Sequence, residues 1–244
     1  MDVIISETKK ELGQKAAAQG SKLIRETIAV RSESNIIVAT GASQFEMFDA
    51  LVKENINWSC VNVFHLDEYI GIPLTHPASF RKYLKERFAD KVSLKTFNYI
   101  NGEEDPAKEC TRLQKIINKY PIDVAFVGIG ENAHLAFNDP PADFETENAY
   151  ICVDLDEACR RQQLGEGWFA NLDEVPNRAI SMSIKQILKS QAIICSVPDR
   201  RKAEAVKNAL TGPVTPDIPS SVLQQHATTW IYLDKDSASL LTGR

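Results

Sequence analysis

The stretch 123–130 reads DVAFVGIG, a short apolar run that ends on two glycines. An uninterrupted run of this length is typical of a strand that is buried on both faces of a parallel sheet. Further apolar runs of the same kind occur at 34–41, 191–198 and 228–234, and the stretch 60–71 begins as such a run and continues as a polar loop. These five runs predict the strands of a single sheet.

Segments with helical spacing of apolar residues separate the runs, at 9–30, 45–53, 79–89, 107–120, 179–190 (with a strand edge) and 199–212. Strands that alternate with helices predict an α/β fold, a single doubly wound Rossmann-like domain over residues 1–244 with a mostly parallel central sheet. In such folds ligands bind outside the carboxyl ends of the strands. The candidate site segments are therefore 39–43, 65–69, 128–134 and 197–202.

Composition narrows the functional class. Of the 244 residues, 43% are apolar and 25% are charged, and the net charge is −5. This mild acidity argues against a nucleic-acid partner, which would require a basic surface. The five cysteines are odd in number, scattered and without a CxxC pair, so reduced thiols are expected in place of a disulfide framework or a zinc site.

The N-terminus, MDVIISETKKELGQ, turns polar after a few residues and does not resemble a signal peptide. No apolar run reaches the roughly 18 residues of a membrane span. We therefore expect a cytoplasmic protein without a membrane partner.

The segment 39–43, ATGAS, places a glycine and two hydroxyl groups at a strand-to-helix turn. Thr40 and Ser43 can donate hydrogen bonds to an anion, and the following helix N-terminus favours negative charge. The alternative is that Ser43 simply caps the next helix. The GxxxxGK[ST] pattern of a P-loop is absent from this turn.

Two further strand ends carry groups suited to proton transfer. Asp67 and Glu68 follow directly after an apolar strand, and alternation along extended chain predicts that only one of them faces the cleft. His134 follows the glycines of 123–130, with Asp139 a few residues later to orient it. The alternatives are a solvated loop acid and a structural histidine.

Basic residues open the last helical segment, where Lys202 lies in the first turn beside two arginines. Cations are unfavourable at a helix N-terminus. The cluster is therefore either a solvated surface or a clamp for an anion.

Three motifs together carry a family resemblance: TGAS after the first strand, LDEYIGIPLTHPASF at 66–80, and GIGENAHLAFNDPP at 128–141. In these motifs the chain resembles the glucosamine-6-phosphate deaminase/isomerase family, which shares its fold with the 6-phosphogluconolactonases. Tyr69 after the acidic pair and the AFNDP continuation are both more similar to the amino-sugar branch than to the lactonases.

The resemblance implies a mechanism without metal or organic cofactor. Asp67 matches the general base that moves a proton between C2 and C1 of an opened sugar, and His134 matches the residue that assists ring opening. Asp139 matches the acid that pairs with this histidine. The residues that match the phosphate site are Thr40, Gly41, Ala42, Ser43 and Lys202. The substrate implied is a small phosphorylated sugar.

The chain departs from the family pattern at three places. Asn132 and Ala133 precede the histidine where the family commonly has Asp-Gly, so the charged partner of His134 is expected to be Asp139. Asp139 itself is a methylene shorter than the usual Glu. The phosphate arginine has no clean match, and Arg160 is the residue we expect to replace it.

These departures leave other functions open. One is a related activity, on galactosamine 6-phosphate or as an isomerase without loss of ammonia. Others are a hydrolase of the 6-phosphogluconolactonase type and a non-catalytic sensor of sugar phosphates. The oligomeric state is also open, a homo-oligomer included.

Overall fold

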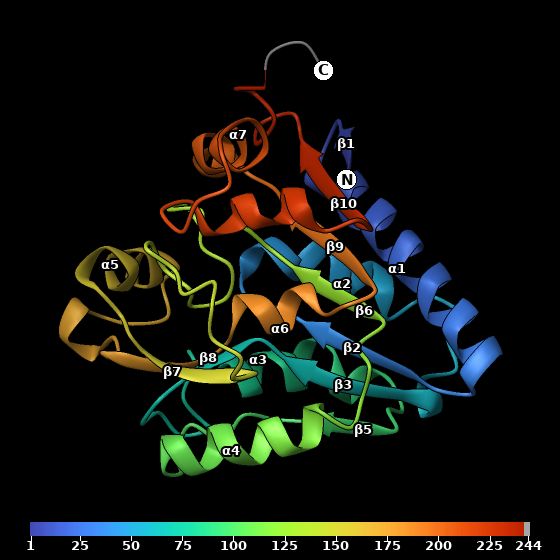
Figure 1. The fold of residues 1–244 in the computed structure, drawn as a ribbon, viewed down its shortest axis with the longest axis horizontal. Helices are drawn as coiled ribbons and strands as arrows, with labels where there is room; N and C mark the ends of the chain where they lie inside the picture. Colours follow the sequence, from blue (N-terminus) through green and yellow to red (C-terminus); the bar gives the residue numbers. More distant parts are fainter. Residues whose placement is uncertain (242–244) are drawn as a thin grey trace.

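The computed structural model describes residues 1–241, and a seven-stranded sheet forms its centre (Figure 1). Every hydrogen-bonded pair of strands in this sheet is parallel. In spatial order the strands are β1 (Asp2–Ser6), β10 (Thr229–Asp234), β9 (Ala192–Val197), β6 (Val124–Val127), β2 (Ser34–Val38), β3 (Val61–His65) and β5 (Thr96–Asn98). All five predicted strands are present, and the short edge strands β1 and β5 are additional.

Helices cover both faces of this sheet. On β2, Ile36 and Val38 pack in the cluster that contains Leu12 of the first helix, whereas Ile37 packs in the opposite cluster. The first face is covered by α1 (Lys9–Arg31), α2 (Phe45–Leu51) and α3 (Phe80–Arg87), and the second by α4 (Pro106–Ile117), α6 (Ile184–Leu188) and α7 (Ala203–Thr211). The doubly wound α/β fold is thus confirmed.

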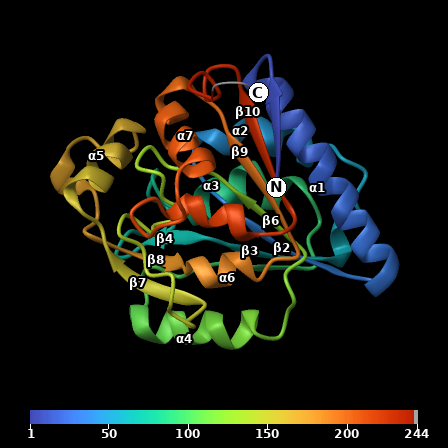
Figure 2. The same cartoon turned by 45° about the horizontal axis from the view of Figure 1, so that its top comes forward.

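A small antiparallel sheet lies beside the main one, with the order β4 (Asp67–Tyr69), β8 (Arg178–Met182) and β7 (Tyr150–Asp154). Helix α5 (Glu157–Gly165) lies next to it, on the side of the molecule opposite α1, in both Figure 1 and Figure 2. Tyr69, Cys159 and Ala179 pack in one apolar cluster, which attaches α5 to this sheet. The sequence predicted neither α5 nor β7, and it predicted a polar loop where β4 lies.

The order of the strands locates a crevice. From β2 the chain runs outward through β3 to β5, and then returns to β6 on the other side of β2. Connections therefore leave the carboxyl ends of β2 and β6 in opposite directions, which opens a space between them.

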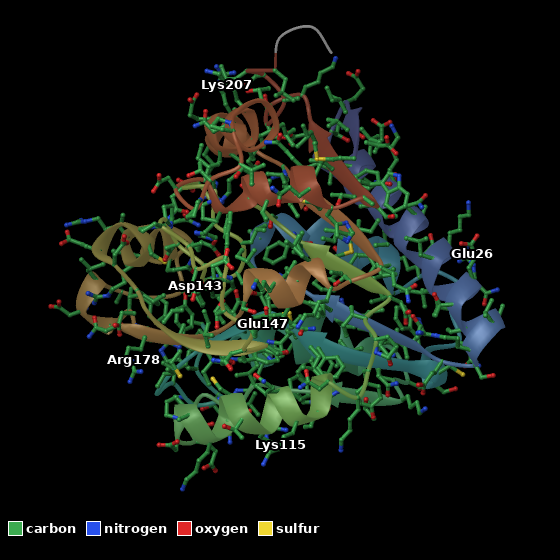
Figure 3. All side chains as sticks on the ribbon, in the orientation of Figure 1. Glu26, Lys115, Asp143, Glu147, Arg178 and Lys207 are labelled. Carbon is green, nitrogen blue, oxygen red and sulfur yellow. The ribbon has the colours of Figure 1, made fainter. Side chains whose placement is uncertain are left out.

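The outer surface is polar. In Figure 3 the labelled side chains of Glu26, Lys115 and Lys207 lie at the periphery of the ribbon, and all three residues are exposed. Within residues 1–241, no helix combines the length and the apolar character needed to cross a bilayer.

Candidate active site

A pocket lies at the predicted edge of the sheet, with a space of about 550 Å³ that includes its opening to solvent. It collects residues from the carboxyl ends of β2, β3, β6 and β9. Among the residues that line it are Thr40, Gly41, Ser43, Asp67, Gly130, His134 and Lys202. The structure thus brings most of the predicted site residues into one space.

Hydrogen bonds fix the conformation of the loop that follows β2. Gly41 has a φ of 92°, a backbone conformation that favours glycine, and the Tyr83 hydroxyl donates to its carbonyl at 3.0 Å. Gln44 is buried, and its side-chain amide lies 3.4 Å from carbonyl oxygens of Val127 and Ser196. Ser43 makes no capping bond at the start of α2, so its hydroxyl remains available to the pocket.

Asp67 is the carboxylate of the acidic pair that faces the pocket. Its residue is only 6% exposed, and the Thr40 hydroxyl donates to Oδ1 at 3.3 Å. Burial raises the pKa of Asp67 to about 8, and the neighbouring charge of Glu68 adds to the rise, while the Thr40 hydrogen bond opposes it. Such a carboxyl group can exchange protons near neutral pH.

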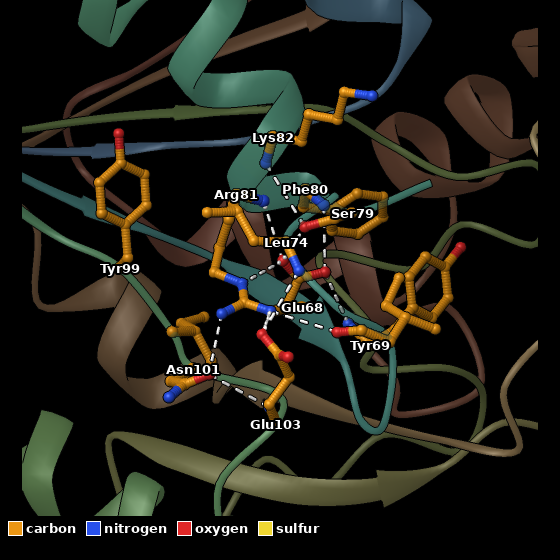
Figure 4. Close-up of polar contacts among 12 residues, drawn as sticks. Glu68, Tyr69, Leu74, Ser79, Phe80, Arg81, Lys82, Tyr99, Asn101 and Glu103 are labelled. Atoms are coloured by element: carbon orange, nitrogen blue, oxygen red, sulfur yellow. Dashed lines mark hydrogen bonds and ion pairs between the residues drawn. The ribbon is translucent and has the colours of Figure 1, made fainter. Parts of the chain in front are cut away.

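Glu68 points the other way, as alternation along the strand predicted. It is fully buried and accepts hydrogen bonds from the Ser79 hydroxyl at 2.9 Å and from the backbone N–H groups of Phe80 at 3.0 Å and Arg81 at 2.8 Å. The Arg81 guanidinium completes this cluster at 3.2 Å (Figure 4). Glu68 therefore fixes β4 to the start of α3 and holds the neighbouring Asp67 in place.

His134 lines the pocket, whereas its partners Asp139 and Asn132 lie behind it, outside the lining. Nδ1 of His134 lies 3.0 Å from Oδ1 of Asp139, in ion-pair contact but not aligned as a hydrogen bond. Asn132 donates from Nδ2 to the same oxygen at 2.9 Å, and its own oxygen accepts from the His134 backbone N–H at 3.3 Å. Burial favours the neutral acid, but the contacts with His134 and Asn132 prevail and lower the pKa of Asp139.

The backbone around His134 restricts which residues can stand at positions 130 and 133. A Cβ atom on Gly130 would lie 2.3 Å from Nε2 of His134, so glycine is required there. Ala133 has a φ of 67°, in the left-handed region that glycine adopts more readily. An alanine thus occupies a backbone position that glycine adopts with less strain.

Lys202 reaches the pocket from the end of β9. Its residue is 6% exposed, and burial lowers its pKa. Among residues 1–241 it is the one lysine or arginine that lines the pocket.

Arg160 does not meet the expectation of a phosphate contact. Its guanidinium donates to the carbonyl oxygens of Val175 at 3.1 Å and of Leu172, and it does not line the pocket. Because of its position on α5, the Arg160 side chain points toward the segment 172–175, which follows the helix. Ala42 lies beside a neighbouring hollow that also contains Trp168, not in the pocket itself.

Three residues of the α5 region line the pocket and were not predicted: Gln162, Gln163 and Glu166. Their spacing places them on one helix face, a signal that the sequence does contain. Which part of the molecule this helix face contacts depends on the packing of α5, which the sequence does not specify. Gln163 accepts a hydrogen bond from the Tyr69 hydroxyl at 2.7 Å, whereas the Glu166 carboxylate has no hydrogen-bond or ion-pair partner within residues 1–241.

The sequence profile of one protein family, described as glucosamine-6-phosphate isomerases/6-phosphogluconolactonase, matches residues 7–231. The chain belongs to this family. The sequence resemblance is thereby confirmed, and the pocket described above lies within the matched residues.

In sequence, the chain is more similar to two glucosamine-6-phosphate deaminases than to a 6-phosphogluconolactonase that shares its fold. A glucosamine-6-phosphate deaminase of Clostridium botulinum is 35% identical over 100% of this chain and 98% of its own length. A solved monomeric glucosamine-6-phosphate deaminase has a TM-score of 0.89 and 30% identity, and covers 98% of this chain and 100% of its own. A 6-phosphogluconolactonase of Trypanosoma brucei has a TM-score of 0.82 at 14% identity, over 99% of this chain and 98% of its own, and so shares the fold.

Proposed function

We propose that the protein is a glucosamine-6-phosphate deaminase, which converts glucosamine 6-phosphate and water into fructose 6-phosphate and ammonia. The observation that carries the proposal is one pocket lined by both Asp67, a buried carboxyl group with a raised pKa, and His134, which contacts Asp139 behind it. The full-length similarity to deaminases at 30–35% identity supports this choice of branch.

The phosphate of the substrate would bind where two hydroxyl groups and a cation converge. Ser43 and Thr40 supply the hydroxyls from the loop after β2, and the Thr40 hydroxyl exchanges its hydrogen bond to Asp67 for one to the phosphate. Lys202 supplies the charge from the end of β9. This places the far end of the sugar, with its reacting carbons, toward Asp67 and His134.

His134 would open the sugar ring. Its imidazole transfers a proton between the anomeric hydroxyl and the ring oxygen, and Asp139 stabilises the imidazolium that forms. Asn132 carries no charge, and its role is to hold Asp139 in position by the hydrogen bond at 2.9 Å.

Asp67 would then act on the open chain. As a carboxylate it takes the proton from C2 and returns it to C1 through an enediol-type intermediate that carries nitrogen at C2. Water adds to C2, and the carbon–nitrogen bond breaks to release ammonia. No step requires a group other than the acids and bases of the pocket and a water molecule.

The rate should depend on the ionisation of Asp67. Because only the carboxylate is a base and its pKa is raised to about 8, kcat/KM is expected to rise with pH toward a midpoint near 8. Thr40 lowers this pKa by its hydrogen bond, so Thr40→Ala should move the midpoint of kcat/KM upward. The ionisations of the substrate itself do not change with the variant. A midpoint that is identical in wild type and Thr40→Ala would contradict Asp67 as the group observed.

Gly130→Ala is expected to lower kcat by roughly 10- to 100-fold, because displacement of a catalytic group by about 1 Å has effects of this size. The new methyl group would overlap the His134 ring, which must move. Gly165→Ala is the matched control, since a Cβ at Gly165 meets nothing within 4 Å. Steady-state kinetics of the two variants test the prediction, and wild-type kcat in Gly130→Ala would exclude a role for the His134 ring position.

The proposed function is tested by incubation of the purified protein with glucosamine 6-phosphate and enzymatic assay of ammonia and fructose 6-phosphate. Both products should form in equal amounts. Formation of neither product, with galactosamine 6-phosphate or 6-phosphogluconolactone turned over instead, would replace the proposal with one of the alternative activities.

We also infer a cytoplasmic location. All five cysteines are free, and Cys110 and Cys152 remain unbonded with their Sγ atoms only 3.7 Å apart. Reduced thiols at this distance fit a reducing compartment.

A further inference from the structure

Glu166 places a carboxylate in the pocket, close to the loop that is proposed to hold the phosphate. It follows α5 directly, lines the pocket together with Gly41, and its Oε2 lies 3.9 Å from the position of a Cβ built on Gly41. No hydrogen bond or salt bridge to this carboxylate occurs within residues 1–241. Burial raises the pKa of Glu166, while the charges of Lys202, Arg201 and His134 counteract the rise.

The charges of the pocket do not suit a purely anionic ligand. Asp67, with a pKa of about 8, is mostly uncharged at pH 7, so Lys202 is opposed by the Glu166 carboxylate, and Arg160 is engaged elsewhere. A phosphate dianion bound at the 40–43 loop would lie beside Glu166 and be repelled by it. A positive group on the same ligand would offset this repulsion.

The amine of an amino-sugar phosphate lies where this offset can occur. It is attached to C2, the same carbon from which Asp67 is proposed to take a proton. Glu166 and Asp67 line the same pocket, so an ammonium group at C2 would share one space with the Glu166 carboxylate.

We propose that Glu166 is a specificity-determining residue that selects sugar phosphates carrying an ammonium group over those carrying a hydroxyl at the same carbon. This inference rests on the proposed function. The repulsion between Glu166 and the phosphate is common to both ligands and cancels in the ratio of their affinities. The attraction to the ammonium group does not cancel, and so it sets the preference.

The test uses two open-chain ligands that differ only at C2 and are not turned over, 2-amino-2-deoxyglucitol 6-phosphate and glucitol 6-phosphate. Their dissociation constants are measured by calorimetry at pH 7 with the full chain. In Glu166→Gln the preference for the amine should fall on the order of tenfold, the effect of one partly buried charge pair. Glu166→Asp, which keeps the charge, should retain part of the preference.

Glu157→Gln is the matched control, because it removes an exposed α5 carboxylate that is paired with Arg161 away from the pocket. Its affinity ratio should equal that of wild type. If Glu166→Gln binds both ligands with the wild-type ratio, the role of Glu166 is wrong and the proposed function stands. If wild type binds neither ligand, the proposed function fails, and this inference fails with it.

Discussion

Asp67→Asn is expected to lower kcat for deamination by about a thousandfold, within the range that general bases contribute. Asparagine has nearly the same shape as aspartate and can still contact the Thr40 hydroxyl, but it does not accept a proton from carbon. The affinity for 2-amino-2-deoxyglucitol 6-phosphate should change little by comparison. A variant that keeps more than a tenth of the wild-type kcat would show that another group is the base.

The same variant should be more stable than wild type at alkaline pH. The pKa of Asp67 is about 8 in the folded state against 3.8 in the ordinary state, so between these values the folded protein keeps a proton that the unfolded chain has lost. Wild-type stability therefore falls as pH rises through this window, by at most roughly 1.4 kcal/mol per unit. Asparagine does not titrate. Urea unfolding should show that the stability advantage of Asp67→Asn over wild type grows by about 2–4 kcal/mol between pH 5 and pH 8; an advantage that stays the same at both pH values would contradict the raised pKa.

Arg81→Met is expected to reduce the free energy of unfolding by about 3–5 kcal/mol, because it leaves the buried Glu68 without its counter-charge. Arg81 also donates to Asn101 Oδ1 at 2.8 Å and lies 3.0 Å from Glu103, contacts visible in Figure 4. The substitution therefore removes the contacts of Arg81 with Glu68, Asn101 and Glu103 together. Activity should fall as well, since Glu68 fixes the strand that carries Asp67.

Arg161→Met provides the comparison for this stability change. Arg161 pairs with Glu157 at the surface, where both side chains are about two-thirds exposed (64% and 65%), and such pairs contribute at most about 1 kcal/mol. The double variant Arg81→Met with Glu68→Gln should recover part of the lost stability, because it removes the uncompensated charge. If Arg81→Met alone lowers the free energy of unfolding by less than about 1 kcal/mol, the backbone N–H groups of residues 80 and 81 are sufficient to stabilise the buried carboxylate of Glu68.

The main sheet was predictable because its strands are short apolar runs that the chain buries on both faces. Ile36, Ile37 and Val38 show why, since successive side chains pack in opposite clusters and all must be apolar. Strand β1 escaped prediction because it is half exposed along its length and is defined by pairing with β10, more than 200 residues away. Local pattern carries no information about that pairing.

The site was predictable where chemistry follows directly from a strand end. Alternation along β4 correctly separated Asp67 from Glu68, and the His134–Asp139 contact was expected from their proximity in sequence. The α5 region was not predictable in the same way. Arg160 and Glu166 are both polar residues on one short helical segment, and only the packing of α5 onto the small sheet decides that Glu166 faces the pocket.

The most direct test of the account is proton NMR of glucosamine 6-phosphate incubated with the protein in D₂O. If Asp67 moves the C2 proton, the C2–H signal of the substrate should disappear as the signals of fructose 6-phosphate grow, and Asp67→Asn should leave the C2–H signal intact. A wild-type protein that binds glucosamine 6-phosphate, retains its C2 proton and forms no ketose would contradict the account.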